Sequence, residues 1–198
     1  MARHKEFDPD VALDRAMGLF WEQGYEKTSM QDLVERMGVH KRSMYDTFGD
    51  KHSLYLKALN RYAETVQRGL REDAEAEESP REALRRLFRS SIAGIGETPK
   101  GCLAVNCATE MASRDPEVAG WVERNFDEWY RVLVDLVRRG QRAGEVSPQA
   151  DPGLLAGSLF NAWVGLRVQV RAGASRERLE EMVDGMLVML HAPERPAG

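Results

Sequence analysis

The sequence predicts an all-α protein of about nine helices. At four places proline directly follows a residue with a short polar side chain, and hydrophobic residues between these places recur every three or four positions. Such side chains cap free backbone amides, and proline suits the first position of a helix. Signals for β-strands are nearly absent. The four predicted helix starts are Asp8-Pro9, Ser79-Pro80, Asp115-Pro116 and Asp151-Pro152.

The predicted helices follow from these signals in chain order. The first two carry apolar stripes, Leu13 to Phe20 and Met30 to Met37, in which residues three and four apart share one face. Thr28 to Gln31 also matches a capping box, which places a helix start there. The expected helices span Pro9 to Gln23, Ser29 to Met37, Lys41 to Thr47, Lys51 to Glu72, Pro80 to Ile95, Leu103 to Ser113, Pro116 to Arg142, Pro152 to Arg171 and Arg176 to His191.

Length and composition set the class of protein. The chain has 198 residues, of which 42% are hydrophobic, so it can form a sizeable core. Its first residues are charged, and its longest apolar run is interrupted by Asn161 and Arg167, so we expect a cytoplasmic protein with no membrane span. The net charge of −4 gives no general hint of nucleic acid, and any DNA-binding surface must be local.

Helix length changes near residue 50. The first three predicted helices are short and the later ones are longer. We therefore expect two domains, residues 1–50 and residues 51–198.

The segment from Thr28 to Lys51 has the parts of a helix-turn-helix. Gly38 can end the first helix in the left-handed conformation, and Val39 can fill the angle between the two helices. Met44 and Phe48 then anchor the second helix. This register leaves an outward face suited to DNA near a helix N-terminus, where amides favour phosphate. That face carries His40, Lys41, Arg42, Ser43 and Thr47.

Two stretches, Gly24 to Leu33 and Gly38 to Lys51, resemble the signature of the TetR family of transcriptional regulators. They combine a Gly-aromatic turn, a Thr cap, a Gly-Val turn and a Tyr-x-x-Phe core in one register. The resemblance implies that helices one to three bind DNA, that helix four connects, and that the last two helices dimerise. It also implies a repressor that a small molecule releases from its operator.

The same resemblance assigns roles to individual residues. It implies that Lys41, Arg42 and Ser43 reach base edges, and phosphate contacts position the protein whereas base contacts specify the sequence. The implied phosphate contacts are Thr28, Tyr45 and Lys51, and we include Ser29 beside Thr28 in the DNA-binding set.

The last two predicted helices are apolar over more than one face, which predicts a homodimer and hence a palindromic operator. The alternative is that these residues are internal core. The predicted dimer contacts are Leu159, Trp163, Leu166, Val183, Met186 and Leu190.

Polar residues among aromatic ones predict a pocket for a small, mostly apolar effector. The alternative is plain core, with Glu110 exposed. The predicted ligand residues are Asn106, Glu110, Phe126, Trp129 and Asn161.

The sequence also bears on three other functions. Cys102, just before a helix N-terminus, could make the chain a redox-sensing regulator, although a buried cysteine is the simpler interpretation for it and for Cys107. A helical ligand-binding dimer without DNA binding is another alternative. The four histidines are scattered without metal-ligand spacing and no nucleophile or phosphate-loop motif occurs, so we expect no metal, no cofactor and no enzyme.

Overall fold

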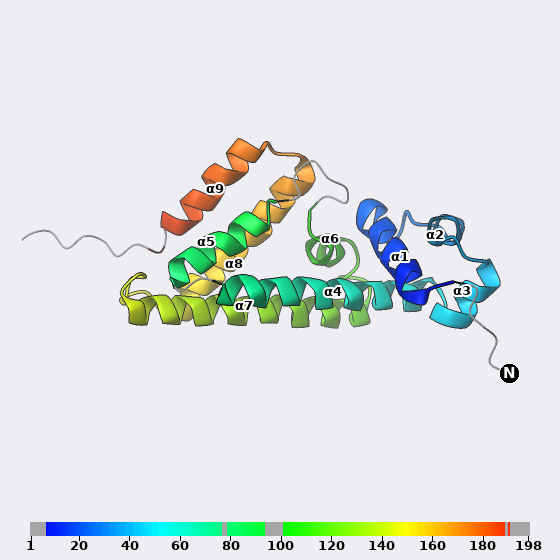
Figure 1. Ribbon diagram of the computed structural model, residues 1–198, viewed down its shortest axis with the longest axis horizontal. Coiled ribbons are helices and arrows are strands. Elements are labelled where there is room, and N and C mark those ends of the chain that lie inside the picture. Colours follow the sequence, from blue (N-terminus) through cyan, green and yellow to red (C-terminus); the bar gives the residue numbers. More distant parts are fainter. Residues whose placement is uncertain (1–6, 77–78, 94–100, 189, 191–198) are drawn as a thin grey trace, which may run out of the picture. The chain divides into compact units, whose positions relative to one another are not determined.

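The computed structural model describes residues 7–76, 79–93, 101–188 and 190, and every regular element in these ranges is a helix (Figure 1). The predicted all-α class is therefore confirmed. The helices are α1 (Pro9–Gln23), α2 (Met30–Met37), α3 (Lys41–Phe48), α4 (Lys51–Glu75), α5 (Pro80–Ser90), α6 (Leu103–Glu110), α7 (Pro116–Ala143), α8 (Pro152–Ala172) and α9 (Arg176–Val188).

All four predicted proline-marked helix starts are confirmed. The Asp8 carboxylate accepts hydrogen bonds from two amides of the first turn of α1, and the Ser79 hydroxyl accepts one from the Glu82 amide of α5. Asp151 caps α8 in the same way. The Asp115 Oδ1 atom accepts from the amides of Glu117 and Val118 at the start of α7. Each cap satisfies amides that have no partner inside their own helix.

Several predicted bounds differ from the structure. α2 begins one residue later than expected, because Ser29 caps it in a reciprocal capping box with Asp32. α6 ends at Glu110 rather than Ser113, because the chain turns there to let Asp115 cap α7. α5 ends at Ser90 and a turn follows at residues 91–93, so the helix predicted to continue toward Ile95 is wrong for these residues. Ile95 and His191 themselves lie outside the described residues.

The chain divides into two compact units. Unit 1 runs to Val66 and includes Cys102–Val122, and unit 2 comprises Gln67–Gly101 and the chain from Glu123 onward. Both α4 and α7 therefore contribute their first part to unit 1 and the remainder to unit 2. The expected functional boundary at residue 50 stays a prediction, since compactness alone does not identify which residues bind DNA.

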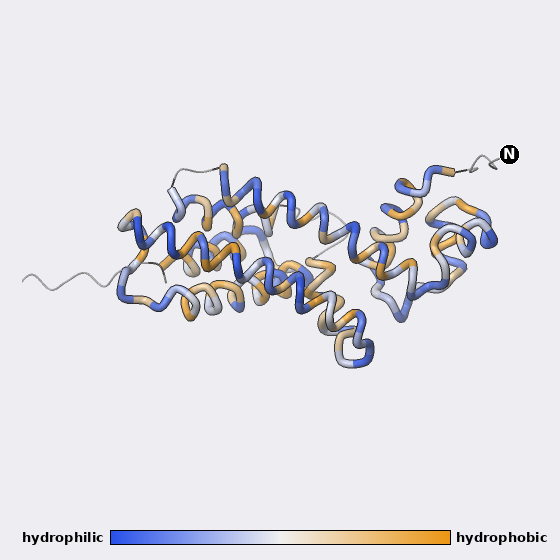
Figure 2. The backbone as a smooth tube through the Cα atoms, turned by 90° about the horizontal axis from the view of Figure 1, so that it is seen from below, coloured by the Kyte–Doolittle hydropathy of each residue, from blue (hydrophilic) through white to orange (hydrophobic). Residues whose placement is uncertain are grey.

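Each unit has its own apolar core, built from one face of each helix. Figure 2 shows hydrophobic and hydrophilic residues alternating along the helices at helical spacing. In unit 1, Phe20 of α1 packs its ring edge-on against Tyr55 of α4, with ring centroids 4.9 Å apart. In unit 2, α5 and α8 pack against α9. Among the described residues, no helix is long and apolar enough to span a membrane.

Candidate nucleic-acid interface

A tight turn sets the angle between α2 and α3. Gly38 adopts the left-handed conformation, with φ of 69° and ψ of 36°, and its amide donates to the carbonyls of Val34 and Glu35. A side chain would be strained at this φ, so glycine is the residue that fits. Val39 follows and is buried. The turn thus ends α2 and directs α3 away from it.

The register of α3 separates a buried face from an exposed one. Met44 and Phe48, four residues apart, are buried in unit 1. His40, Lys41, Arg42 and Tyr45 are exposed, whereas Ser43 and Thr47 are half-buried. The predicted anchoring residues are therefore the observed ones, and they turn the predicted cationic face of α3 outward.

The cations of α3 are exposed, and within the part of the chain that the structure describes Arg42 has only one, weak ionic partner. The Arg42 side chain is 91% exposed, and its Nε atom lies 3.9 Å from an oxygen of Asp46, whose side chain is 71% exposed. An exposed pair of this kind contributes little stability, so it does not hold Arg42 in place. The N-cap residue His40 makes no side-chain hydrogen bond to the first amides of α3. Those amides can therefore receive phosphate oxygens.

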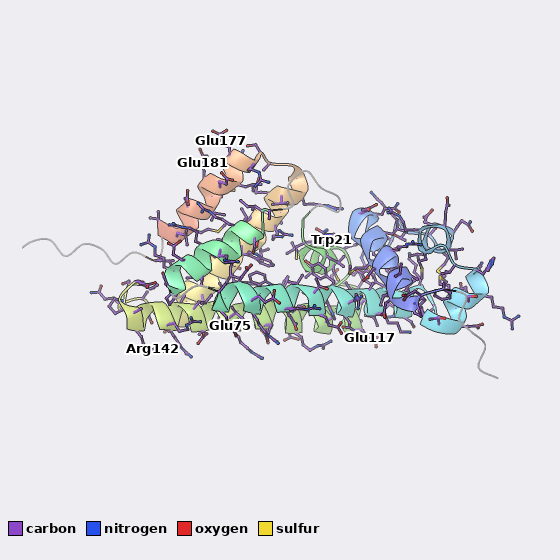
Figure 3. The ribbon with its side chains drawn as sticks, viewed as in Figure 1. Trp21, Glu75, Glu117, Arg142, Glu177 and Glu181 are labelled. Atoms are coloured by element: carbon purple, nitrogen blue, oxygen red, sulfur yellow. The ribbon has the colours of Figure 1, made fainter. Side chains whose placement is uncertain are left out.

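The beginning of α4 is fixed to the α1–α2 turn and to the start of α7. The Lys51 Nζ atom lies 4.2 Å from the centre of the Tyr25 ring, in cation–π distance. His52 Nε2 lies 2.7 Å from Asp115 Oδ2, and its Nδ1 lies 3.7 Å from Glu117, which Figure 3 labels near the start of α7. Burial raises the pKa of Asp115, but the Val118 amide and His52 outweigh it and hold that pKa below its ordinary value.

The structure corrects the expectation for Thr28. This residue is 0% exposed, and its hydroxyl donates to the Gly24 carbonyl at 2.6 Å. A buried, internally bonded side chain cannot hold a phosphate, so the predicted Thr28 contact is wrong. Ser29 is exposed but its hydroxyl caps α2 by accepting from the Asp32 amide at 3.1 Å. The capping position is one residue later than the sequence pattern indicated.

Comparison with known proteins decides the family. Residues 12–58 match the model of bacterial regulatory proteins of the tetR family, and residues 80–186 match the tetracyclin repressor-like C-terminal domain. The chain belongs to the TetR family. It is a transcriptional regulator with a helix-turn-helix, and members of this family are regulators rather than enzymes, as the sequence predicted.

Individual TetR-family relatives extend over almost the whole chain. The HTH-type transcriptional regulator YezE of Bacillus subtilis is 35% identical over 196 residues, which cover 96% of this chain and 100% of the relative. The HTH-type transcriptional repressor ComR of Escherichia coli is 32% identical, over 91% of this chain and 87% of ComR. A cysteine mutant of the regulator CifR, solved with 26-bp operator DNA, has a TM-score of 0.87 and 31% identity, over 96% of this chain and 100% of CifR.

The five residues predicted to bind a ligand fall into both units, each of which is described by itself. In unit 1, Asn106 is half-buried, and its Nδ2 atom is buried without a hydrogen-bond acceptor. Both carboxylate oxygens of Glu110 accept backbone amides of the α1–α2 turn. Glu110 is thus a fixed structural partner of that turn, which the sequence did not indicate.

The unit 2 members of the predicted ligand set lie in different surroundings. The ring of Trp129 stacks on Trp163 with centroids 4.2 Å apart, and Phe126 packs edge-on against Phe160 at 5.2 Å. Asn161 is exposed, whereas Trp129 and Trp163 are buried. A single pocket containing all five residues stays a prediction.

The predicted dimer contacts are corrected by burial. All six of them, Leu159, Trp163, Leu166, Val183, Met186 and Leu190, are at most 7% exposed in the single chain. These six side chains form part of the core of unit 2, so they expose too little surface to contact a second chain. The alternative interpretation, internal core, is the one that the structure supports for these residues.

A different stripe of α8 is exposed instead, which the sequence did not predict. Its apolar ends are Leu154 and Val168, which are 76% and 49% exposed. Between them lie three small or polar residues, also exposed, at alternating spacings of four and three: Ser158, Asn161 and Gly165. This spacing keeps the stripe on one side of the helix. On α9, Glu181, Gly185 and Val188 are exposed at the same spacing.

Both cysteines are free thiols in the interior of unit 1. Cys102 is 2% exposed, and its Sγ atom lies 3.1 Å from the Tyr62 hydroxyl. Burial raises the pKa of Cys107 to about 11, although its hydrogen bond with Tyr55 acts in the opposite direction. A buried thiol with a raised pKa, such as Cys107, is a weak nucleophile. Cys102 is shielded from solvent by its burial, so redox sensing through Cys102 gains no support from this geometry.

Proposed function

We propose that the chain is a homodimeric repressor that binds a palindromic operator through α3 and leaves it when a small, mostly apolar effector binds. In a bacterium this regulator would act in the cytoplasm, where the DNA is. The observation that carries the proposal is the register of α3, in which Met44 and Phe48 are buried while Lys41 and Arg42 are exposed in its first turn, where the N-cap side chain makes no capping bond.

The proposed DNA contacts divide into two classes. Lys41, Arg42 and Ser43 are assigned to base edges, because they occupy the first turn of the helix that enters the major groove. Tyr45 and Lys51 are assigned to phosphates. His40, Ser29 and Thr47 complete the proposed surface. The CifR complex with operator DNA supports DNA binding by a chain of this fold.

The proposed effector site includes Asn106. Its buried Nδ2 atom has no acceptor, and an unsatisfied buried donor costs about 1–3 kcal/mol. An effector with one hydrogen-bond acceptor would remove this cost, while an apolar body would supply the remaining affinity. We place the effector beside Asn106 and do not include Glu110, whose oxygens are already occupied.

The proposed dimer uses the exposed stripes of α8 and α9. Leu154 and Val168 would bury apolar surface against a second chain, and Gly165 would allow close approach of the two helices. A two-fold dimer presents its recognition helices symmetrically, which is why the operator should be palindromic.

The proposal is tested by selection of binding sites from random double-stranded DNA with the purified chain. The expected product is a palindrome whose half-sites lie about one helical turn apart, or a pair of overlapping palindromes filled by two dimers. The double variant Lys41→Ala, Arg42→Ala is the control and should enrich no sequence. The proposed function fails if the wild-type chain also enriches none.

A further inference from the structure

The Glu110 side chain at the end of α6 holds two backbone amides of the α1–α2 turn. Its Oε2 atom accepts a hydrogen bond from the Tyr25 amide at 3.0 Å, and its Oε1 atom accepts one from the Glu26 amide at 2.9 Å. The partners are 85 and 84 residues apart in the chain. Hydrogen bonds to an ionised acceptor are about twice as strong as neutral ones. This pair of bonds, the Glu110 clamp, connects α6 to the helix-turn-helix within unit 1.

The turn is shaped to admit the carboxylate. Gly24 has φ of 85°, and a Cβ atom at this position would lie 2.7 Å and 2.8 Å from the two Glu110 oxygens. Any residue other than glycine at position 24 would therefore displace the Glu110 carboxylate and strain the backbone. Glycine at this position allows the clamp to form, and the clamp in turn fills the space beside the glycine.

The clamped turn leads directly into α2. The Gly24 carbonyl accepts the buried Thr28 hydroxyl, and the Thr28 amide donates to the Tyr25 carbonyl at 3.2 Å. Ser29 then caps α2. Every residue from Gly24 to Ser29 except Lys27 thus takes part in the clamp or in the hydrogen bonds that connect it to the first turn of α2.

Asn106 lies one helical turn before Glu110 on α6. Residues four apart share one face of a helix, so the unpartnered Asn106 amide and the clamp lie along the same side. α6 is short, with eight residues, and its N-cap Cys102 makes no side-chain capping bond. A displacement of α6 at Asn106 would therefore also move the Glu110 carboxylate. A shift of well under 1 Å already weakens a hydrogen bond.

From these contacts we infer that Glu110 is a positioning residue: its carboxylate sets the α1–α2 turn for DNA binding, and effector binding at Asn106 acts on the helix-turn-helix through this contact. The inference rests on the proposed function for its effector half. The DNA half can be measured without any effector. It predicts that loss of the carboxylate changes the turn and the affinity for DNA while the fold persists.

The first experiment compares Glu110→Ala and Glu110→Gln with wild type by amide NMR and by affinity for the selected operator. In Glu110→Ala, the Tyr25 and Glu26 amide signals should move upfield and exchange faster with solvent, and operator affinity should fall about tenfold. Glu110→Gln keeps one acceptor oxygen and should rescue one of the two amides and part of the affinity. Glu123→Gln, an exposed neutralisation on α7, is the control and should change neither quantity.

The second experiment imitates an effector with Asn106→Phe, which inserts bulk at the proposed site. Alone, it should lower operator affinity and shift the two clamp amides. In the Glu110→Ala background it should have little further effect, because the contact that it acts through is already lost. Additive effects of the two substitutions would overturn the coupling half of the inference.

Each remaining outcome also decides a part of the inference. Unchanged Tyr25 and Glu26 amides in a folded Glu110→Ala variant would overturn the positioning role. If Asn106→Phe does not fold, circular dichroism will show it, and Asn106→Leu replaces it in the same cycle with the same expected non-additivity. If wild type enriches no DNA sequence, the proposed function fails, whereas the amide shifts still decide whether the clamp fixes the turn.

Discussion

The recognition helix α3 and the long helix α8 present opposite cases of how a helix divides its residues. On α3, buried anchors are apolar and exposed residues are polar or charged, apart from Tyr45. On α8, both the buried face and the exposed stripe contain large apolar side chains, Leu159 on one and Leu154 on the other. The polarity of a residue therefore predicts whether it is buried or exposed on α3, but not on α8.

The difference follows from what each outer face meets. A DNA-binding face must stay hydrated and positive until it meets phosphate, so it contrasts with the core. A face that pairs with another protein chain buries apolar surface as a core does. On α8, only burial distinguishes the apolar residues of the core from those of the exposed stripe. The same applies on α9 to Val183, which is buried, and Val188, which is exposed.

The largest effect expected is from Trp163→Glu on α8. This side chain stacks on Trp129, and its indole N–H donates to the Ser91 hydroxyl at 2.8 Å. A carboxylate there would be buried without a partner, so the free energy of unfolding should fall by about 4 kcal/mol or more. Thermal unfolding followed by circular dichroism measures this loss. A Trp163→Glu chain that stays fully folded but becomes monomeric would instead place Trp163 at the interface.

Arg42→Ala on α3 should affect DNA recognition while leaving the fold intact. If Arg42 forms a bidentate contact with a base, operator affinity should fall by about 1–3 kcal/mol and preference should relax at one base position. Lys51→Ala should weaken cognate and random DNA alike and reduce the salt dependence. Titration at two salt concentrations separates the two effects. The control is Arg124→Ala, an exposed arginine of α7, which should change neither; equal loss on all sequences in Arg42→Ala would contradict its assignment.

Ser29→Ala tests the cap that starts α2. The Ser29 hydroxyl accepts from the Asp32 amide, and the Asp32 carboxylate accepts from the Ser29 amide. Loss of an N-cap serine costs about 1 kcal/mol, so denaturant unfolding should show that decrease. Ser113→Ala, at an exposed serine between α6 and α7, serves as the matched control. A Ser29→Ala variant as stable as the control would mean that the capping box contributes nothing.

The smallest expected effect is the acid dependence contributed by Asp115. Its pKa is lowered in the folded chain, so the ionised carboxylate stabilises the fold above its ordinary pKa of about 3.9. That stabilisation is lost as the pH falls through the lowered value. Asp115→Asn should therefore be less stable than wild type at neutral pH, and the difference should shrink in acid. Unfolding curves at several pH values measure the difference in free energy of unfolding between the two chains. A difference that grows in acid would contradict a stabilising role for the ionised Asp115 carboxylate.

The sequence predicted best those features that depend on neighbouring residues. The proline-marked starts of α1, α5, α7 and α8 need an N-cap side chain and a proline, which are adjacent in the chain. The buried positions of Met44 and Phe48 follow from helical periodicity and the turn at Gly38. These features determine most of the fold and the exposed face of α3.

Features that depend on distant residues were not predictable in the same way. Glu110 is a polar residue near a helix end, and nothing nearby indicates that its partners are the amides of Tyr25 and Glu26. Thr28 and Ser29 can both cap a helix, and the choice depends on the Gly24 carbonyl that takes the Thr28 hydroxyl. For α8, the four-and-three spacing from Leu154 to Val168 was visible, but the sequence could not say which apolar stripe faces outward.

Sedimentation of the chain with its selected operator duplex tests the two outer faces together. Two protomers are expected on each palindrome, or four where two palindromes overlap. The double variant Leu154→Glu, Val168→Glu is expected to stay folded and become monomeric. It should keep its affinity for a single half-site and lose the additional affinity for the full palindrome. A double variant that still binds the palindrome as a dimer with wild-type affinity would contradict the proposed division between a DNA-reading α3 and a chain-pairing α8.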